Sequence, residues 1–171
     1  MGQQQLLLLV LGVVIVGLAV VVGIQAFTEN QQKSEIDRYV DQGVAMSGDI
    51  VAFYLKPTAQ GGAGRNADAL GDLAISDLGY REDRTDTWNG FERSGVVENG
   101  VVRYVGASDT HPFLHIHRFP QSPGDPRVEV HVFGPSPNCV VTRSDIYEVS
   151  PTWSDGKADN EAPDAPAGCS W

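Results

Sequence analysis

The sequence begins with an unbroken apolar segment that carries no charged side chain. Residues 6–24 read LLLLVLGVVIVGLAVVVGI, which is 19 apolar or glycine residues in a row, and no Asp, Glu, Lys or Arg occurs before residue 29. As an α-helix this run would measure about 28 Å, close to the roughly 30 Å hydrocarbon core of a bilayer. We therefore expect residues 1–28 to form a helix that enters lipid or packs among other helices.

A cleaved secretory signal does not account for this segment. Such a signal begins with a positive stretch, contains 7 to 15 apolar residues and ends in a small-residue cleavage site. The chain instead starts MGQQQ, without Lys or Arg, and leaves the apolar run through GIQAFTEN. The pattern predicts that the apolar helix stays attached to the rest of the chain.

The segment that follows, residues 29–57, continues the helix with one apolar face. Its larger apolar residues recur every three to four positions, and charged residues lie between them. They are Ile36, Tyr39, Val40, Val44, Ile50, Val51 and Tyr54. Pro57 gives a stop signal. The spacing predicts a single helix from about Gln5 to Lys56, apolar all round in its first half and amphipathic in its second.

Residues 58–171 read as a globular domain that ends in strands. We expect a loop after Pro57 and then a short helix over 67–78, capped by Asn66 and ended by Gly79. Residues 80–93 read as a surface connection pinned by Trp88 and Phe91.

The remainder of this domain is strand-like. Asn99-Gly100 between valine-rich arms predicts a hairpin. Further strands are expected at 113–119, 127–133, 139–143 and around 146–149, with proline at their boundaries. The fold class predicted is α+β, with the long N-terminal helix packed on a small antiparallel sheet.

Charge and cysteine content limit the function classes. Twelve Lys and Arg against 22 Asp and Glu give a net charge of -10, which excludes the basic surface that nucleic-acid binding needs. Cys139 and Cys169 are the only cysteines. In an exported domain they would form one disulfide, whereas in a cytosolic domain they would be two reduced thiols. Lys33 and Arg38, just after the apolar run, weakly favour the cytosolic side.

One strand pair carries residues suited to metal binding. Alternation places His115 and His117 on one face of their strand, and Glu129 and His131 on one face of the next. A hairpin symmetric about its turn would set His115 opposite His131 and His117 opposite Glu129, a donor set that suits zinc. The alternative, which we favour, is a sheet with a Leu, Ile and Val core face and a polar face that is wet or packs on a neighbour.

Other site chemistry is sparse. Asp155, Asp159 and Glu161 could hold calcium, although acidic loops on so acidic a protein are usually just solvated. The sequence has no P-loop, GxGxxG or GxSxG motif. We therefore expect no enzymatic activity.

The order of these features resembles the type IV pilin and pseudopilin family. The resemblance covers the chain in outline: an uncharged helix containing glycines, its amphipathic continuation, a loop, an antiparallel sheet and a C-terminal loop bounded by cysteines. In that family a peptidase removes a short leader, and subunits leave the cytoplasmic membrane to pack their apolar helices into a filament core. The resemblance implies that Met1 is the mature terminus or that Met1-Gly2 is a minimal leader.

The resemblance also assigns assembly roles within the first helix. If Met1 is the mature terminus, Gln5 stands where the family usually has a glutamate that pairs with a neighbouring subunit's terminal amine. Glutamine can accept only a neutral hydrogen bond, which is roughly half as strong as a charge-assisted one. The apolar run begins at Leu6, and Gly12, Gly17 and Gly23 would allow helices to approach closely, although their spacing is not GxxxG.

Three functions remain open from the sequence. The first is a pilin-like structural subunit of an extracellular filament, a homopolymer that resides in the cytoplasmic membrane before an assembly machinery moves it to the cell surface. The second is a membrane-anchored β-rich domain outside the cell that could bind a metal. The third is a minor pseudopilin of a secretion system, which differs from the first in copy number and partners.

Overall fold

The computed structural model describes residues 2–82, 94–97, 100–105, 111–118, 124–146 and 163–171. Helix α1 runs from Gly2 to Leu55, which confirms the single long helix expected over 5–56. The chain divides into two compact units, Met1–Glu35 and Ile36–Trp171. The first contains the apolar part of α1, and the second contains the amphipathic part of α1 and the rest of the described chain.

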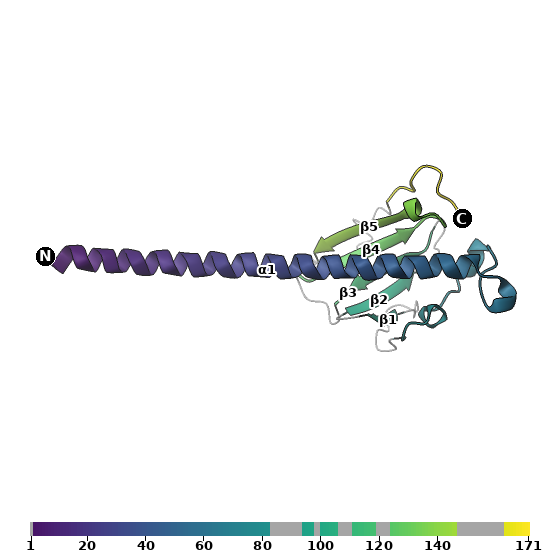
Figure 1. Cartoon of the computed structure of the whole chain (residues 1–171), viewed down its shortest axis with the longest axis horizontal. Coiled ribbons are helices and arrows are strands. Elements are labelled where there is room, and N and C mark those ends of the chain that lie inside the picture. The colour runs from purple at the N-terminus through teal and green to yellow at the C-terminus, as the bar shows by residue number, and fades with distance from the viewer. Residues whose placement is uncertain (1, 83–93, 98–99, 106–110, 119–123, 147–162) are drawn as a thin grey trace, which may run out of the picture. The chain divides into compact units, whose positions relative to one another are not determined.

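The second unit is built on a five-stranded antiparallel sheet in which every strand pairs with its neighbours in sequence (Figure 1). Its strands are β1 (Ser94–Val97), β2 (Gly100–Val105), β3 (Phe113–His117), β4 (Pro126–Val132) and β5 (Val140–Ile146). The α+β class and the antiparallel sheet are therefore confirmed. The strand expected around 146–149 falls mostly on residues outside the described ranges, and β5 itself reaches Ile146.

The core lies between one face of the sheet and the second half of α1. The predicted apolar face of β3 and β4 is fully buried, and its five residues are Leu114, Ile116, Val128, Val130 and Val132, each 0% exposed. Tyr39, Met46 and Ile50 of α1 meet them in the same cluster. The predicted residues Tyr39, Ile50 and Tyr54 are buried, whereas Val44 is 47% exposed and Met46, which was not among the predicted residues, is buried in its place.

The connection between α1 and the sheet differs from the prediction. Instead of one helix over 67–78, two 3₁₀ turns form, η2 (Ala67–Leu70) and η3 (Ile75–Leu78), after an earlier turn, η1 (Thr58–Gln60). The predicted ends are correct, because the Asn66 side chain accepts from the Asp68 amide and Gly79 adopts a left-handed conformation. Gly71, directly after η2, still has right-handed helical backbone angles, and the chain becomes extended at Ala74, just before η3.

One further prediction is refined, and another concerns residues that the structure does not describe. Gly100, expected in the Asn-Gly turn, is instead the first residue of β2 and pairs with Val97, and Asn99 lies outside the described ranges. Residues 83–93, with Trp88 and Phe91, are outside the described ranges.

The end of the chain is tied to the sheet and to α1. Cys139, in the short turn η4 (Pro137–Cys139), is bonded to Cys169, as expected for an exported domain. Trp171 donates a hydrogen bond from its indole Nε1 to the Val132 carbonyl, and its ring meets Tyr54 edge-on at 4.8 Å between centroids. The last residue therefore packs beside the C-terminal end of α1.

Candidate assembly helix and histidine face

The first candidate site is the apolar part of α1, which we call the assembly helix (residues 2–28). Its sixteen large apolar side chains, from Leu6 to Phe27, are each between 51% and 68% exposed. Burying a side chain of this kind is worth about 1.5–3 kcal/mol. Leaving all of them in water would therefore cost tens of kcal/mol, and the helix needs a cover that this unit does not itself supply.

This helix is long and apolar enough to cross a membrane by length and composition, and its most apolar stretch is entirely unburied. Of the predicted assembly residues, Gln5 and Leu6 are exposed, and Met1 is outside the described ranges. A Cβ built on Gly12, Gly17 or Gly23 would meet no other part of the described chain within 4 Å. Packing within the described residues therefore does not require glycine at these positions.

The second candidate site is the outward face of β3 and β4, which we call the histidine face. It carries His115, His117, Arg127, Glu129 and His131 at alternating positions, together with His111, two residues before β3. All four histidines of the chain lie here, and they are only 4–7% exposed. The expectation of a wet polar face is therefore wrong for the histidines, which are buried within a single copy of the chain.

The register across this face differs from the symmetric hairpin predicted. His131 pairs with Phe113, His115 with Glu129 and His117 with Arg127. The predicted partners are therefore displaced by two residues along the strand. Because side chains alternate with a period of two, this displacement keeps the same residues on the same face and changes only which of them are neighbours.

The new register keeps the residues predicted to bind zinc near one another but changes which of them are paired. Within the described ranges, no group of three or more His, Cys, Asp or Glu side chains is placed to hold a metal ion. Zinc binding by His115, His117, His131 and Glu129 thus gains no support from the geometry. The calcium candidates Asp155, Asp159 and Glu161 fall on residues that are not described.

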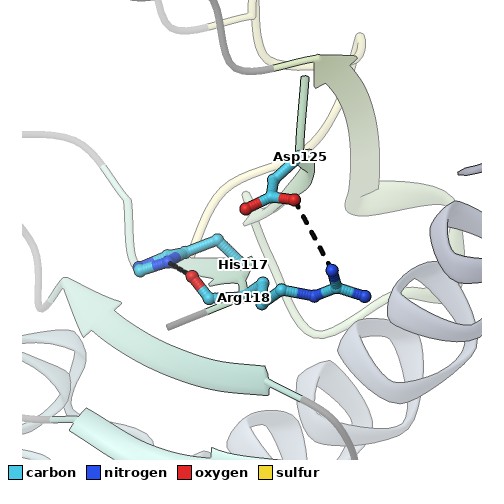
Figure 2. A network of polar contacts seen from close by, with 3 residues as sticks. All are labelled: His117, Arg118 and Asp125. Atoms are coloured by element: carbon cyan, nitrogen blue, oxygen red, sulfur yellow. Dashed lines mark hydrogen bonds and ion pairs between the residues drawn. The ribbon is translucent and has the colours of Figure 1, made fainter. Parts of the chain in front are cut away.

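One histidine-face side chain, His117, contacts a polar pair at the end of β3. The His117 ring donates from Nδ1 to the Arg118 carbonyl oxygen at 2.8 Å, because a carbonyl can only accept (Figure 2). Arg118 in turn forms an ion pair with Asp125, with 3.7 Å between Nη1 and Oδ1 (Figure 2). These contacts join the end of β3 to the residue preceding β4.

The other end of the face is an aromatic cluster. His111 Nε2 lies 2.9 Å from His131 Nδ1, so one ring donates a hydrogen bond to the other. The rings of Phe113 and Phe133 stack on this pair, with centroids 5.1 Å from His131 and 4.0 Å from His111, respectively. His111 was missed in the sequence. Its signal was present, because the alternation of residues 113, 115 and 117 extends back through Pro112 to residue 111.

Electrostatics differ along the face. The His131 ring, with Nε2 3.6 Å from Glu129 Oε2, is the main cause of a lowered pKa for the Glu129 carboxyl. His115 and Arg127 lower this pKa further, against the opposing effect of burial. The pKa of His111 is also lowered, by burial first and by the neighbouring His131 second. The face therefore holds Glu129 and His111, whose pKa values are both lowered.

Comparisons with models of protein families, with curated proteins and with solved structures found no match for this chain. The class of the protein consequently rests on its architecture. It is an α+β protein with one long N-terminal helix that is apolar in its first half, an antiparallel sheet and a disulfide near the C-terminus. This architecture is compatible with that of pilin-like proteins.

Proposed function

We propose that this chain is a pilin-like structural subunit, held in the cytoplasmic membrane by its assembly helix and then polymerised through that helix into an extracellular filament. The observation that carries the proposal is the assembly helix itself. It has no charge over residues 2–28 and exposes every large apolar side chain from Leu6 to Phe27. Lipid can cover this surface before assembly, and the same helices of other copies can cover it afterwards.

The three glycines favour polymerisation over simple anchoring. A glycine inside a helix costs roughly 0.5–1 kcal/mol relative to alanine, and a lipid-facing anchor gains nothing from it. Helices that pack together in an apolar medium do gain, because small residues let their backbones approach closely. Gly12 and Gly23 are 11 residues apart, which at 100° per residue is about 20° from the same direction on the helix.

The disulfide supports export of the second unit. Bonded cysteines persist in oxidising compartments outside the cytosol, and Cys139 and Cys169 are joined. With the amphipathic half of α1 buried against the sheet, the assembly helix is the only part of the described chain with an extended run of exposed large apolar residues. Contacts between copies are therefore expected to centre on it.

The test is fractionation of cells that produce the full chain. We expect it in filaments sheared from the cell surface and labelled in electron micrographs by an antibody to the second unit. Gly12→Leu should shift the chain into the detergent-extracted membrane fraction and reduce the sheared fraction at least tenfold. A Cβ at this position meets no other part of the described chain within 4 Å, and leucine makes the helix more apolar, so insertion into the membrane should be preserved.

The matched control is Val13→Leu, which enlarges an already large neighbouring side chain and should leave both fractions unchanged. Recovery of the unaltered chain only from detergent-extracted membranes would overturn the proposal. That result would instead identify a membrane-anchored domain.

A further inference from the structure

The histidine face has a feature that filament assembly does not use. His111 and His131 are 6% and 4% exposed, and their facing nitrogens are 2.9 Å apart. Two neutral imidazoles form one hydrogen bond at this distance, with a single proton between the facing nitrogens. A protonated ring carries a hydrogen on both of its nitrogens. If both rings were protonated, two N–H groups would point at each other inside the protein.

We propose that His111 and His131 form an acid-released latch, which holds the segment entering β3 against the end of β4 at neutral pH and opens when both rings are protonated. The latch joins segments that are also linked through the backbone, because the Val132 amide donates to the Pro112 carbonyl at 3.0 Å. Opening would therefore release this hydrogen bond and the rings of Phe113 and Phe133 stacked on the pair.

The first proton on the pair is tolerated. Glu129, with its Oε2 3.6 Å from His131 Nε2, favours a hydrogen on that nitrogen because a carboxylate only accepts. A charged His131 can then donate from Nδ1 to a neutral His111. The second proton would add a charge to a buried ring directly beside the first, and it would leave a hydrogen on both of the facing nitrogens, 2.9 Å apart.

The charged residues on the described strands around the pair are few, and they can be named from the strand register. On β4, Arg127 and Glu129 precede His131, and on β3 the other titratable residues are His115 and His117. By register, Arg103 of β2 stands opposite His115, while Arg143 and Asp145 of β5 stand opposite Glu129 and Arg127, and the β5 position opposite His131 is Val141. Glu129 is therefore the only carboxylate of β3, β4 or β5 in the strand positions next to His131 on this face.

The sign of the pH dependence follows from the lowered pKa of His111. In the opened or unfolded form, His111 takes up its proton near the ordinary histidine pKa of about 6.5, whereas the pKa of His111 is lowered in the closed form. Stability of the latch is therefore complete above 6.5 and is lost as the pH falls through the pKa of the closed form. Glu129 contributes in the same direction only at lower pH, because its lowered pKa lies below the usual glutamate range.

The experiment is amide hydrogen exchange on the full chain in detergent micelles at pH 7.5 and pH 5.0, corrected for the intrinsic pH dependence of exchange. We expect the amides of His111 and Phe113 and those of residues 131–133 to exchange at least tenfold faster at pH 5.0. Protection in the distant part of the sheet, such as β1, should change little.

Matched variants test whether His111 and His131 cause the faster exchange in acid. His111→Phe with His131→Phe keeps two stacked rings and removes both titrating groups, so exchange should become independent of pH between 5.0 and 7.5. His117→Phe, on the same face but bonded to the Arg118 carbonyl, should retain the acid response. Equal protection of the unaltered chain at both pH values, or an acid response that persists in the double variant, would overturn the latch.

A measurement on the unaltered chain tests the proposal even if the double variant does not fold. Nuclear magnetic resonance of the imidazole carbons should show that one ring of the pair is still neutral at pH 6, with the second protonation coinciding with loss of protection. Protonation of both rings near 6.5 without loss of protection would contradict the proposal. The latch involves one copy of the chain, so its outcome is independent of whether filaments form.

Discussion

Gly43 is the residue at which α1 approaches the sheet most closely. A side chain at this position would place its Cβ 2.5 Å from Val130 Cγ2 and 3.1 Å from Ile116 Cδ1. Both neighbours are fully buried valine or isoleucine side chains of the core, so neither can move aside without opening other contacts. The glycine therefore sets the distance between the helix and β3 and β4.

We predict that Gly43→Ala lowers the free energy of unfolding by about 1–3 kcal/mol, the usual cost of overpacking a core. Chemical denaturation followed by circular dichroism measures this change. The control is Gly48→Ala, five residues later in the same helix, where an added Cβ meets nothing within 4 Å.

Gly48→Ala should raise the free energy of unfolding by roughly 0.5–1 kcal/mol, because alanine is the better helix former. Equal effects of the two substitutions would show that the close approach at Gly43 carries no strain. Alanine scanning of the two glycines therefore separates helix propensity from packing against the sheet.

At the scale of elements, the periodicity of the sequence predicted which face of each segment is buried. The period near 3.6 in residues 29–57 gave the buried side of α1, and the alternation in β3 and β4 gave the core face. The periodicity does not determine which residue of the neighbouring strand each residue pairs with. Registers that differ by two residues bury the same side chains, so only the turn distinguishes them.

The histidine pair shows the consequence for a site. The sequence placed His115 opposite His131, while the structure sets Phe113 there and brings His131 against His111. Residue 111 lies outside the strand that periodicity defined, behind Pro112. The composition of the face was therefore predictable, whereas the contact between His111 and His131 was not.

The disulfide gives the element-scale prediction. Cys139 and Cys169 close a loop with a separation of 30 residues, and a loop of this length is worth about 3–4 kcal/mol in the chain-entropy description. Replacing both cysteines with serine should lower the free energy of unfolding by about this amount, as measured by urea denaturation. Trp171, two residues after Cys169, should lose protection from fluorescence quenchers because its contact with Tyr54 is no longer held.

The control is the unaltered chain treated with a dithiol reductant, which should reproduce both effects. A variant without the cysteines that unfolds at the same urea concentration as the unaltered chain would show that the packing of Trp171 alone holds the terminus.

At the scale of the whole molecule, charge and burial divide the chain at nearly the same place. All 34 charged side chains lie beyond residue 28, and the first fully buried core residue is Tyr39. The core lies entirely within the unit Ile36–Trp171. Net charge well away from zero keeps proteins soluble. The unit Ile36–Trp171 has both a buried core and most of the charged side chains, whereas the assembly helix has the exposed apolar surface.

We predict that a chain beginning at Glu29 folds, stays soluble without detergent and is monomeric in analytical ultracentrifugation, whereas the full chain needs detergent. Truncation at this point removes no buried core residue, so the thermal midpoint should stay within a few degrees of that of the full chain. A chain beginning at Ala45 is the contrasting case, because it lacks Tyr39 and Gly43 and should fail to unfold cooperatively. Aggregation of the chain beginning at Glu29 would show that the sheet unit itself exposes an association surface, and contacts between copies would then no longer be assigned to the assembly helix alone.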